Sequence, residues 1–147
     1  MSWDAIIMRF GNAKTIDDFP ADFNPPPVAE TASLKATLRR LFPDADHHDD
    51  CSFVEGDDFW LELNHGCHTD ESGNVSAVSV RSNAGKGAIS HLRLLCDALQ
   101  SRMLDIQTSE FADFAADTEK SMQSFSQWRD RALSKYPAES EDGGTER

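Results

Sequence analysis

Short apolar runs, some of them alternating with polar residues, predict five β-strands. The first run, WDAIIMRF, ends at Gly11 and Asn12, as a buried strand does before a turn. In CSFVEGDDFWLELN we predict two strands joined at Gly56, and NVSAVSVRSN and MLDIQ supply two more. In the second strand of the hairpin, apolar positions alternate with exposed ones. The apolar set is Phe59, Leu61 and Leu63, and the opposite face carries Trp60, Glu62 and Asn64.

Apolar residues at helical spacing predict three helices. The first lies in ETASLKATLRRLFP, where leucines share one face and Pro43 ends the helix. The second covers about Ala88 to Arg102 and has the wide apolar stripe of a helix lying on a sheet. The third covers about Thr118 to Lys135 and holds four basic and two acidic residues. It is a basic helix in an acidic chain.

The order of these elements is β-α-β-β-β-α-β-α. This order predicts an α+β domain of two layers, with one mixed sheet of about five strands and three helices packed on it. We expect a single domain over residues 1–136, because that length can bury one core without disulfides or metal. Residues 137–147 contain four acids and few apolar groups, which favours a disordered tail.

The negative charge of the chain is concentrated in one segment. Residues 44–72 contain ten acidic residues and no Lys or Arg, so this segment carries −10 of the net charge of −12 and the remainder carries −2. Nucleic acids and anionic membranes bind clustered Lys and Arg. We therefore expect neither partner, and the sequence leaves the oligomeric state open.

The N-terminal sequence and the cysteines predict a cytoplasmic protein. The start carries Asp4, lacks a basic leader, and has only a short apolar run, unlike a signal peptide. The three cysteines, Cys51, Cys67 and Cys96, are an odd number, which favours reduced thiols over a disulfide framework.

Six short motifs spread over residues 1–133 resemble those of a group of small bacterial α+β proteins with no assigned activity. They are SWD, LFPDAD, FWLEL, VSVR with the following glycine loop, LDIQTSEF and WRDR. The group often has Trp or Pro where this chain has His47 and His48. The resemblance implies an α+β fold. The further comparison with immunity proteins is by analogy.

The segment HHDDCSFVEGDDFWLELNHGCHTD is rich in metal-binding residue types, but its spacing does not predict a metal site. A zinc site drawn from His48, Cys51, Cys67 and His68 lacks two ligand pairs at the usual gaps. A calcium loop starting at Asp44 lacks the glycine needed at its sixth position. We predict no metal and no cofactor.

The stretch VRSNAGKGAISH runs from a strand through a glycine-rich loop into a helix. It places Arg81 and Lys86 near a helix N-terminus, an arrangement that attracts anions. The nucleotide-binding spacings are absent, because Val80 and Ala88 occupy required positions of the phosphate-loop pattern. Glycines that only turn a strand into a helix explain the pattern equally well. No catalytic residue is predicted.

Two functions remain open from the sequence, and so does a third reading in which the acidic face only keeps the protein soluble. The first is a non-enzymatic module that binds or masks a basic protein, as immunity proteins and inhibitors do. Its candidate contact residues are Asp49, Asp50, Glu55, Asp57, Asp58, Trp60 and Glu62. The alternative is an enzymatic or ligand-binding domain that holds a small anion at Arg81 and Lys86. For Trp60 we expect either the basic C-terminal helix to cover it, which the apolar residues of that helix favour, or a partner to contact it.

Overall fold

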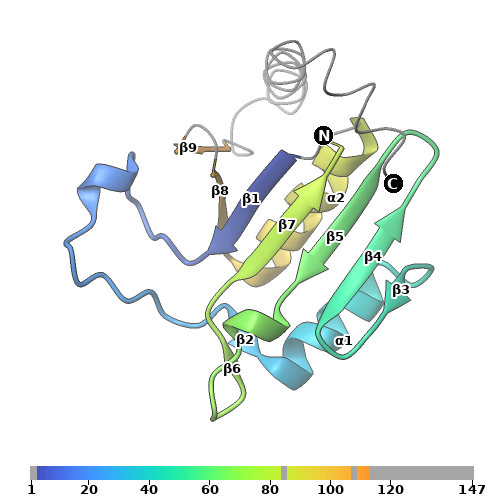
Figure 1. Cartoon of the computed structure of the whole chain (residues 1–147), viewed down its shortest axis with the longest axis horizontal. Helices are drawn as coiled ribbons and strands as arrows, with labels where there is room; N and C mark the ends of the chain where they lie inside the picture. Colours follow the sequence, from blue (N-terminus) through green and yellow to red (C-terminus); the bar gives the residue numbers. More distant parts are fainter. Residues whose placement is uncertain (1–2, 84–85, 107–108, 113–147) are drawn as a thin grey trace, which may run out of the picture.

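A seven-stranded antiparallel sheet forms the centre of the computed structural model, which describes residues 3–83, 86–106 and 109–112 (Figure 1). The spatial order of its strands is β3-β4-β5-β7-β1-β8-β9. The strands span Trp3–Met8 (β1), Asp46–His47 (β3), Cys51–Glu55 (β4), Trp60–Asn64 (β5), Val78–Ser82 (β7), Arg102–Asp105 (β8) and Glu110–Phe111 (β9). A separate pair joins β2 (Ala29–Glu30) to β6 (Asn74–Val75).

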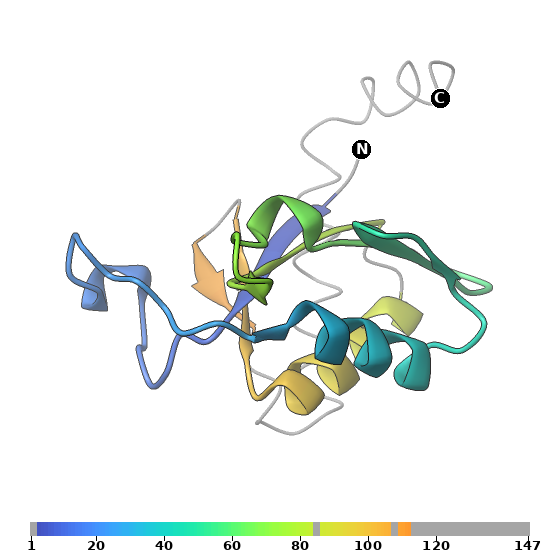
Figure 2. The same ribbon diagram turned by 90° about the horizontal axis from the view of Figure 1, so that it is seen from below.

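Two α-helices cover the same face of the large sheet, as Figure 2 shows. Helix α1 spans Thr31–Leu41 and α2 spans Lys86–Leu99, with short 3-10 turns at Ile16–Asp18 (η1) and Gly66–His68 (η2). Helix α1 ends where the Phe42 amide bonds to the Leu38 carbonyl, just before Pro43. Helix α2 ends in a Schellman-type cap, with Gln100 at φ 50° in the position that glycine usually takes.

The sheet has a buried inner face under the helices and an outer face that mixes polar residues with apolar ones, among them Ile6, Met8 and Leu104. Alternate residues of each strand point inward, which explains the burial pattern BiBiBi along β1. The inner residues pack on leucines of both helices to form one core. Its largest fully buried side chains include Ile7, Leu34, Leu38, Leu61, Leu63, Leu92, Leu95 and Met103.

The tip of the β4–β5 hairpin docks on the first turn of α2 through Phe59. The Phe59 ring lies against Gly56 and Gly87, where any added Cβ would come within 3 Å of ring carbons. The ring of His91 packs on Phe59 with centroids 4.7 Å apart, while His91 Nδ1 donates to the Gly87 carbonyl at 2.7 Å. Gly87, part of the predicted glycine-rich loop, is therefore required by close packing.

The predicted fold class, a mixed five-stranded sheet with three helices, was wrong. All five predicted strands are present, but two-residue edge strands β3 and β9 extend the sheet to seven. The α2 connection does join two strands that run parallel, β7 and β8. However, β1 lies between them and is antiparallel to both, so neighbouring strands in the sheet are all antiparallel. Two α-helices occur in the described residues, and the predicted third helix and the tail 137–147 lie outside them.

Candidate functional site

The outer face of β4 and β5 carries two exposed aromatic residues and two carboxylates in an alternating arrangement. Phe53 lies directly opposite Glu62, and Trp60 lies directly opposite Glu55. The side chains of Phe53 and Trp60 are 41% and 37% exposed, although large aromatic rings usually lie inside a protein. We call these four residues, Phe53, Glu55, Trp60 and Glu62, the aromatic–carboxylate square.

The register of the hairpin explains why the square faces outward. Val54 and Leu61 are paired across the strands and buried, so the residues on either side of them must point to the opposite face. The neighbouring strand holds Trp60 in place, because the Trp60 amide donates to Asn83 Oδ1 at 3.2 Å and the Ser82 hydroxyl donates to the Trp60 carbonyl at 2.8 Å. The prediction that Trp60 and Glu62 lie opposite the buried residues of β5 is confirmed.

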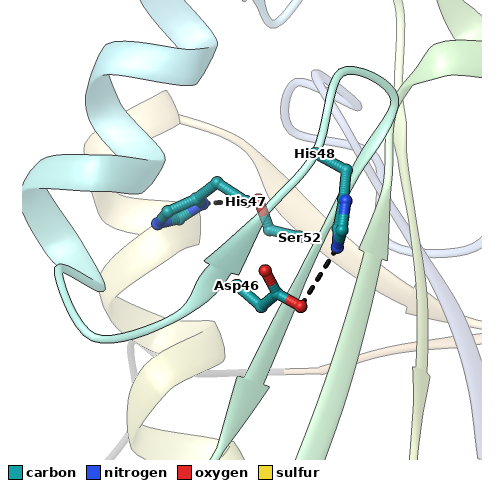
Figure 3. A network of polar contacts seen from close by, with 4 residues as sticks. All are labelled: Asp46, His47, His48 and Ser52. Atoms are coloured by element: carbon teal, nitrogen blue, oxygen red, sulfur yellow. Dashed lines mark hydrogen bonds and ion pairs between the residues drawn. The ribbon is translucent and has the colours of Figure 1, made fainter.

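The histidines next to the square act on opposite sides of strand β3 (Figure 3). His47 points toward α1, where its Nδ1 bonds with Ser52 Oγ at 2.7 Å and its Nε2 donates to the Phe42 carbonyl at 2.9 Å. His48 points outward, with its Nε2 3.1 Å from Asp46 Oδ2 and its ring edge-on to Phe53. His47 thereby fastens the edge strand to the end of α1.

His47 and Ser52 have the contact of a base with a nucleophile, but not the access. Because the Phe42 carbonyl can only accept, a neutral His47 carries its proton on Nε2 and accepts the Ser52 hydroxyl proton at Nδ1. Ser52 is nevertheless only 2% exposed and lies on the inner face. A substrate cannot reach this hydroxyl in the folded protein, so the pair has a structural role.

The structure divides the predicted partner-binding residues into two groups. Asp57 and Asp58 are exposed in the turn after Glu55 and extend the acidic surface around Trp60. Asp49 and Asp50 lie in the turn at the other end of β4. Lys35 Nζ approaches Asp49 at 3.6 Å, and the Asp50 carbonyl accepts the amides of His65 and Gly66.

Arg81 and the start of α2 lie on different sides of the sheet. The Arg81 side chain is exposed on the outer face, with Nε 3.6 Å from Asp4 Oδ1, and it occupies the position directly opposite Glu62. Lys86 begins α2, which packs on the inner face. Arg81 thus lies between two carboxylate positions rather than at the helix N-terminus.

Two of the four residues weighed as zinc ligands, Cys67 and His68, have separate partners. His68 Nε2 lies 2.6 Å from Ser79 Oγ, and Cys67 Sγ contacts Asn64 Oδ1 at 3.6 Å. Burial raises the pKa of the Cys51 thiol, and the neighbouring acids, Glu62 first, raise it further. Burial likewise raises the pKa of Cys96 to about 12. Within the described ranges, His, Cys, Asp and Glu form no group of three able to hold a metal.

His65 is a buried histidine beneath the β4–β5 hairpin. It is 1% exposed, and neither ring nitrogen has a hydrogen-bond partner among the described residues. Burial lowers the pKa of His65 and the charge of Lys35 lowers it further, while Asp50 acts in the opposite direction. His65 is therefore neutral in the folded protein at neutral pH.

A concave region of about 630 Å³ lies between the end of α2, the start of β8 and the loop after β1. Its lining includes Lys14, Asp97, Arg102, Glu110 and Phe111. Arg102 stacks on the Phe111 ring at 4.0 Å and donates to the Gly11 and Ala13 carbonyls. The Arg102 side chain therefore already links β9 to the loop after β1 across this cleft.

Comparisons with known proteins identify no relative: no family model, no curated protein and no solved structure matches the chain. In the part of the chain that the structure describes, no helix has the length and apolar character needed to cross a membrane.

Phe53 is the one residue of the square that the sequence reasoning missed. The signal was present, because Val54 reads as a core residue and strand alternation then sends Phe53 and Glu55 outward together. The predicted C-terminal helix that was expected to cover Trp60 lies outside the described residues.

Proposed function

We propose that the protein is a non-enzymatic acidic module that binds and masks a basic protein, as an immunity or inhibitor protein does. The observation that carries the proposal is the aromatic–carboxylate square, an exposed aromatic pair within the segment that holds ten acids and no Lys or Arg. Exposed aromatic residues are the usual anchors of protein interfaces.

The distribution of charge supports the same class of partner. Concentrated negative charge speeds the encounter with a basic surface and disfavours acidic partners. The aromatic residues then supply apolar contacts whose contribution to the affinity does not depend on the salt concentration. Such a division, with charge for the encounter and aromatic rings for the bound state, suits an inhibitor that must find its target quickly.

The enzymatic alternative has no comparable observation in its favour. Arg81 faces Asp4 and Glu62 on the outer face, and the Ser52 hydroxyl is buried. We also propose a cytoplasmic location, because Cys51, Cys67 and Cys96 are free thiols.

A pair of charge-matched variants tests the proposal. The partner is captured on the tagged full chain, identified, purified, and titrated by calorimetry at several salt concentrations. The triple variant Glu55→Gln, Asp57→Asn, Glu62→Gln removes three charges near Trp60. Its control removes three exposed charges elsewhere, and consists of Asp17→Asn, Asp22→Asn and Glu71→Gln.

We expect the first triple variant to weaken binding by about tenfold or more and to flatten the salt dependence, because its charges meet the partner. The control should bind as the unmodified protein does. Equal weakening by both variants would mean that only net charge matters, and the proposed surface would be wrong.

A further inference from the structure

We infer that the aromatic–carboxylate square is a receptor for an arginine side chain of the basic partner. This inference rests on the proposed binding function and adds the chemical group that the surface selects. Each aromatic residue of the square lies opposite a carboxylate, and each of the two strands carries one aromatic residue and one carboxylate.

The spacing of the square matches a guanidinium group. Side chains directly opposite each other on antiparallel strands have Cβ atoms about 5 Å apart, and alternate residues on one strand lie about 7 Å apart. A cation stacked on Trp60 is thus within reach of Glu55 across the strand pair. Phe53 lies on the same face, two residues before Glu55 and diagonal to Trp60.

Glu55 and Glu62 both lie opposite an aromatic residue, and Glu62 also lies opposite Arg81. Glu62 lies in a row with Phe53 on one side and Arg81 on the other, and Arg81 in turn approaches Asp4. The outer face therefore already places one guanidinium between two carboxylate positions. In the next row, Glu55 is paired with Trp60, and no strand pairing among the described residues places an arginine next to either of them.

Arginine fits this arrangement better than lysine. Its guanidinium is planar, stacks on aromatic faces, and still directs N–H donors sideways toward a carboxylate. The ammonium of lysine is a compact and strongly hydrated charge that gains less from stacking. Charge complementarity selects the occupant, since Asp57 and Asp58 add negative charge beside the square and no Lys or Arg occurs from residue 44 to residue 72.

The test uses the full chain and three synthetic peptides of one length, which carry arginine, lysine or neutral citrulline at the same positions. Binding is followed by calorimetry and by NMR signals of the Trp60 indole and the β4–β5 amides. The test variants are Trp60→Leu and Glu55→Gln. The controls are Leu94→Ala, which alters a half-exposed apolar residue on α2, and Glu71→Gln.

We expect the arginine peptide to bind most tightly and to shift the Trp60 indole signal, with citrulline inactive. Each test variant should weaken arginine binding about threefold and the double variant about tenfold, while the controls leave it unchanged. These results would support the receptor.

Other results separate this inference from the proposed function. If the arginine and lysine peptides bind equally and Trp60→Leu has no effect, while the acidic triple variant still loses the partner, the receptor is wrong and the binding module stands. If the NMR signal of the Trp60 indole does not shift on addition of any peptide because another segment of this chain occupies the square, the receptor is also wrong. If the acidic triple variant retains full affinity for the partner, the proposed function fails as well.

Discussion

Replacement of Gly87 by alanine tests the packing that positions the tip of the acidic hairpin. An alanine Cβ at this position would lie 2.4 Å from Phe59 Cδ1 and 2.5 Å from Cε1, well inside contact distance. The ring has little room to retreat, because it also lies against Gly56, where an added Cβ would meet Phe59 Cε1 at 2.1 Å, and because His91 packs on it. The clash must therefore displace the hairpin or the start of α2.

The expected magnitude follows from two opposing effects. Overpacking a buried ring costs about 1 to 3 kcal/mol, whereas alanine gains up to about 1 kcal/mol over glycine inside a helix. Gly87 is the second residue of α2, where the helical gain is small. We therefore expect Gly87→Ala to lower the free energy of unfolding by about 1 to 2 kcal/mol.

Urea unfolding followed by circular dichroism measures this difference, with Ser33→Ala on the exposed surface of α1 as the control for helix propensity. The smaller side chain of Phe59→Leu should make the alanine less costly, so the double variant should lose less than the sum of the two single variants. A Gly87→Ala protein as stable as the unmodified one, or more stable, would refute the packing argument.

Three further predictions concern stability. The folded-state pKa of His65 is lowered, so the stability that depends on a neutral His65 is fully present above the unfolded pKa of about 6.5 and is lost as the pH falls below it. His65→Leu should remove this loss of stability from the pH dependence of the urea midpoint. His47→Ala leaves the Phe42 carbonyl and the Ser52 hydroxyl without their partner and should cost about 1 to 3 kcal/mol in urea unfolding; an unchanged midpoint would contradict the role of His47 in fastening β3. EDTA should leave the thermal melting temperature unchanged, because an apolar core of this size can be stable without a metal; a large downward shift would show that a metal stabilises the fold.

Periodicity was informative wherever an element had enough residues to show it. The five longer strands and both described helices were predicted, and the alternation in β5 placed Trp60 on the correct face. Strands β3 and β9 have two residues each, too few for a periodic pattern, so they are defined only by the neighbours they pair with. Their absence from the prediction is the main reason that the predicted sheet was too small.

Features that depend on contacts distant in sequence could not be predicted. The position of β1 between β7 and β8 depends on tertiary pairing, which the order of elements along the chain does not specify. The role of Gly87 depends on Phe59, which lies 28 positions earlier, and the link from His47 to Ser52 depends on the turn between them. The acidic character of the candidate surface was visible in the sequence, whereas its pairing of aromatic residues with carboxylates required the register.

The central claim is that the Trp60 side of the sheet is open for a partner, and acrylamide quenching of fluorescence in the full chain tests it most directly. The Trp60 component is obtained as the difference between the unmodified protein and Trp60→Phe, since Trp3 and Trp128 are common to both proteins. We predict that acrylamide quenches this component readily, and that saturating basic partner protects it. A Trp60 component that resists quenching in the protein alone would mean that the chain covers its own aromatic–carboxylate square, and the proposed binding surface would be wrong.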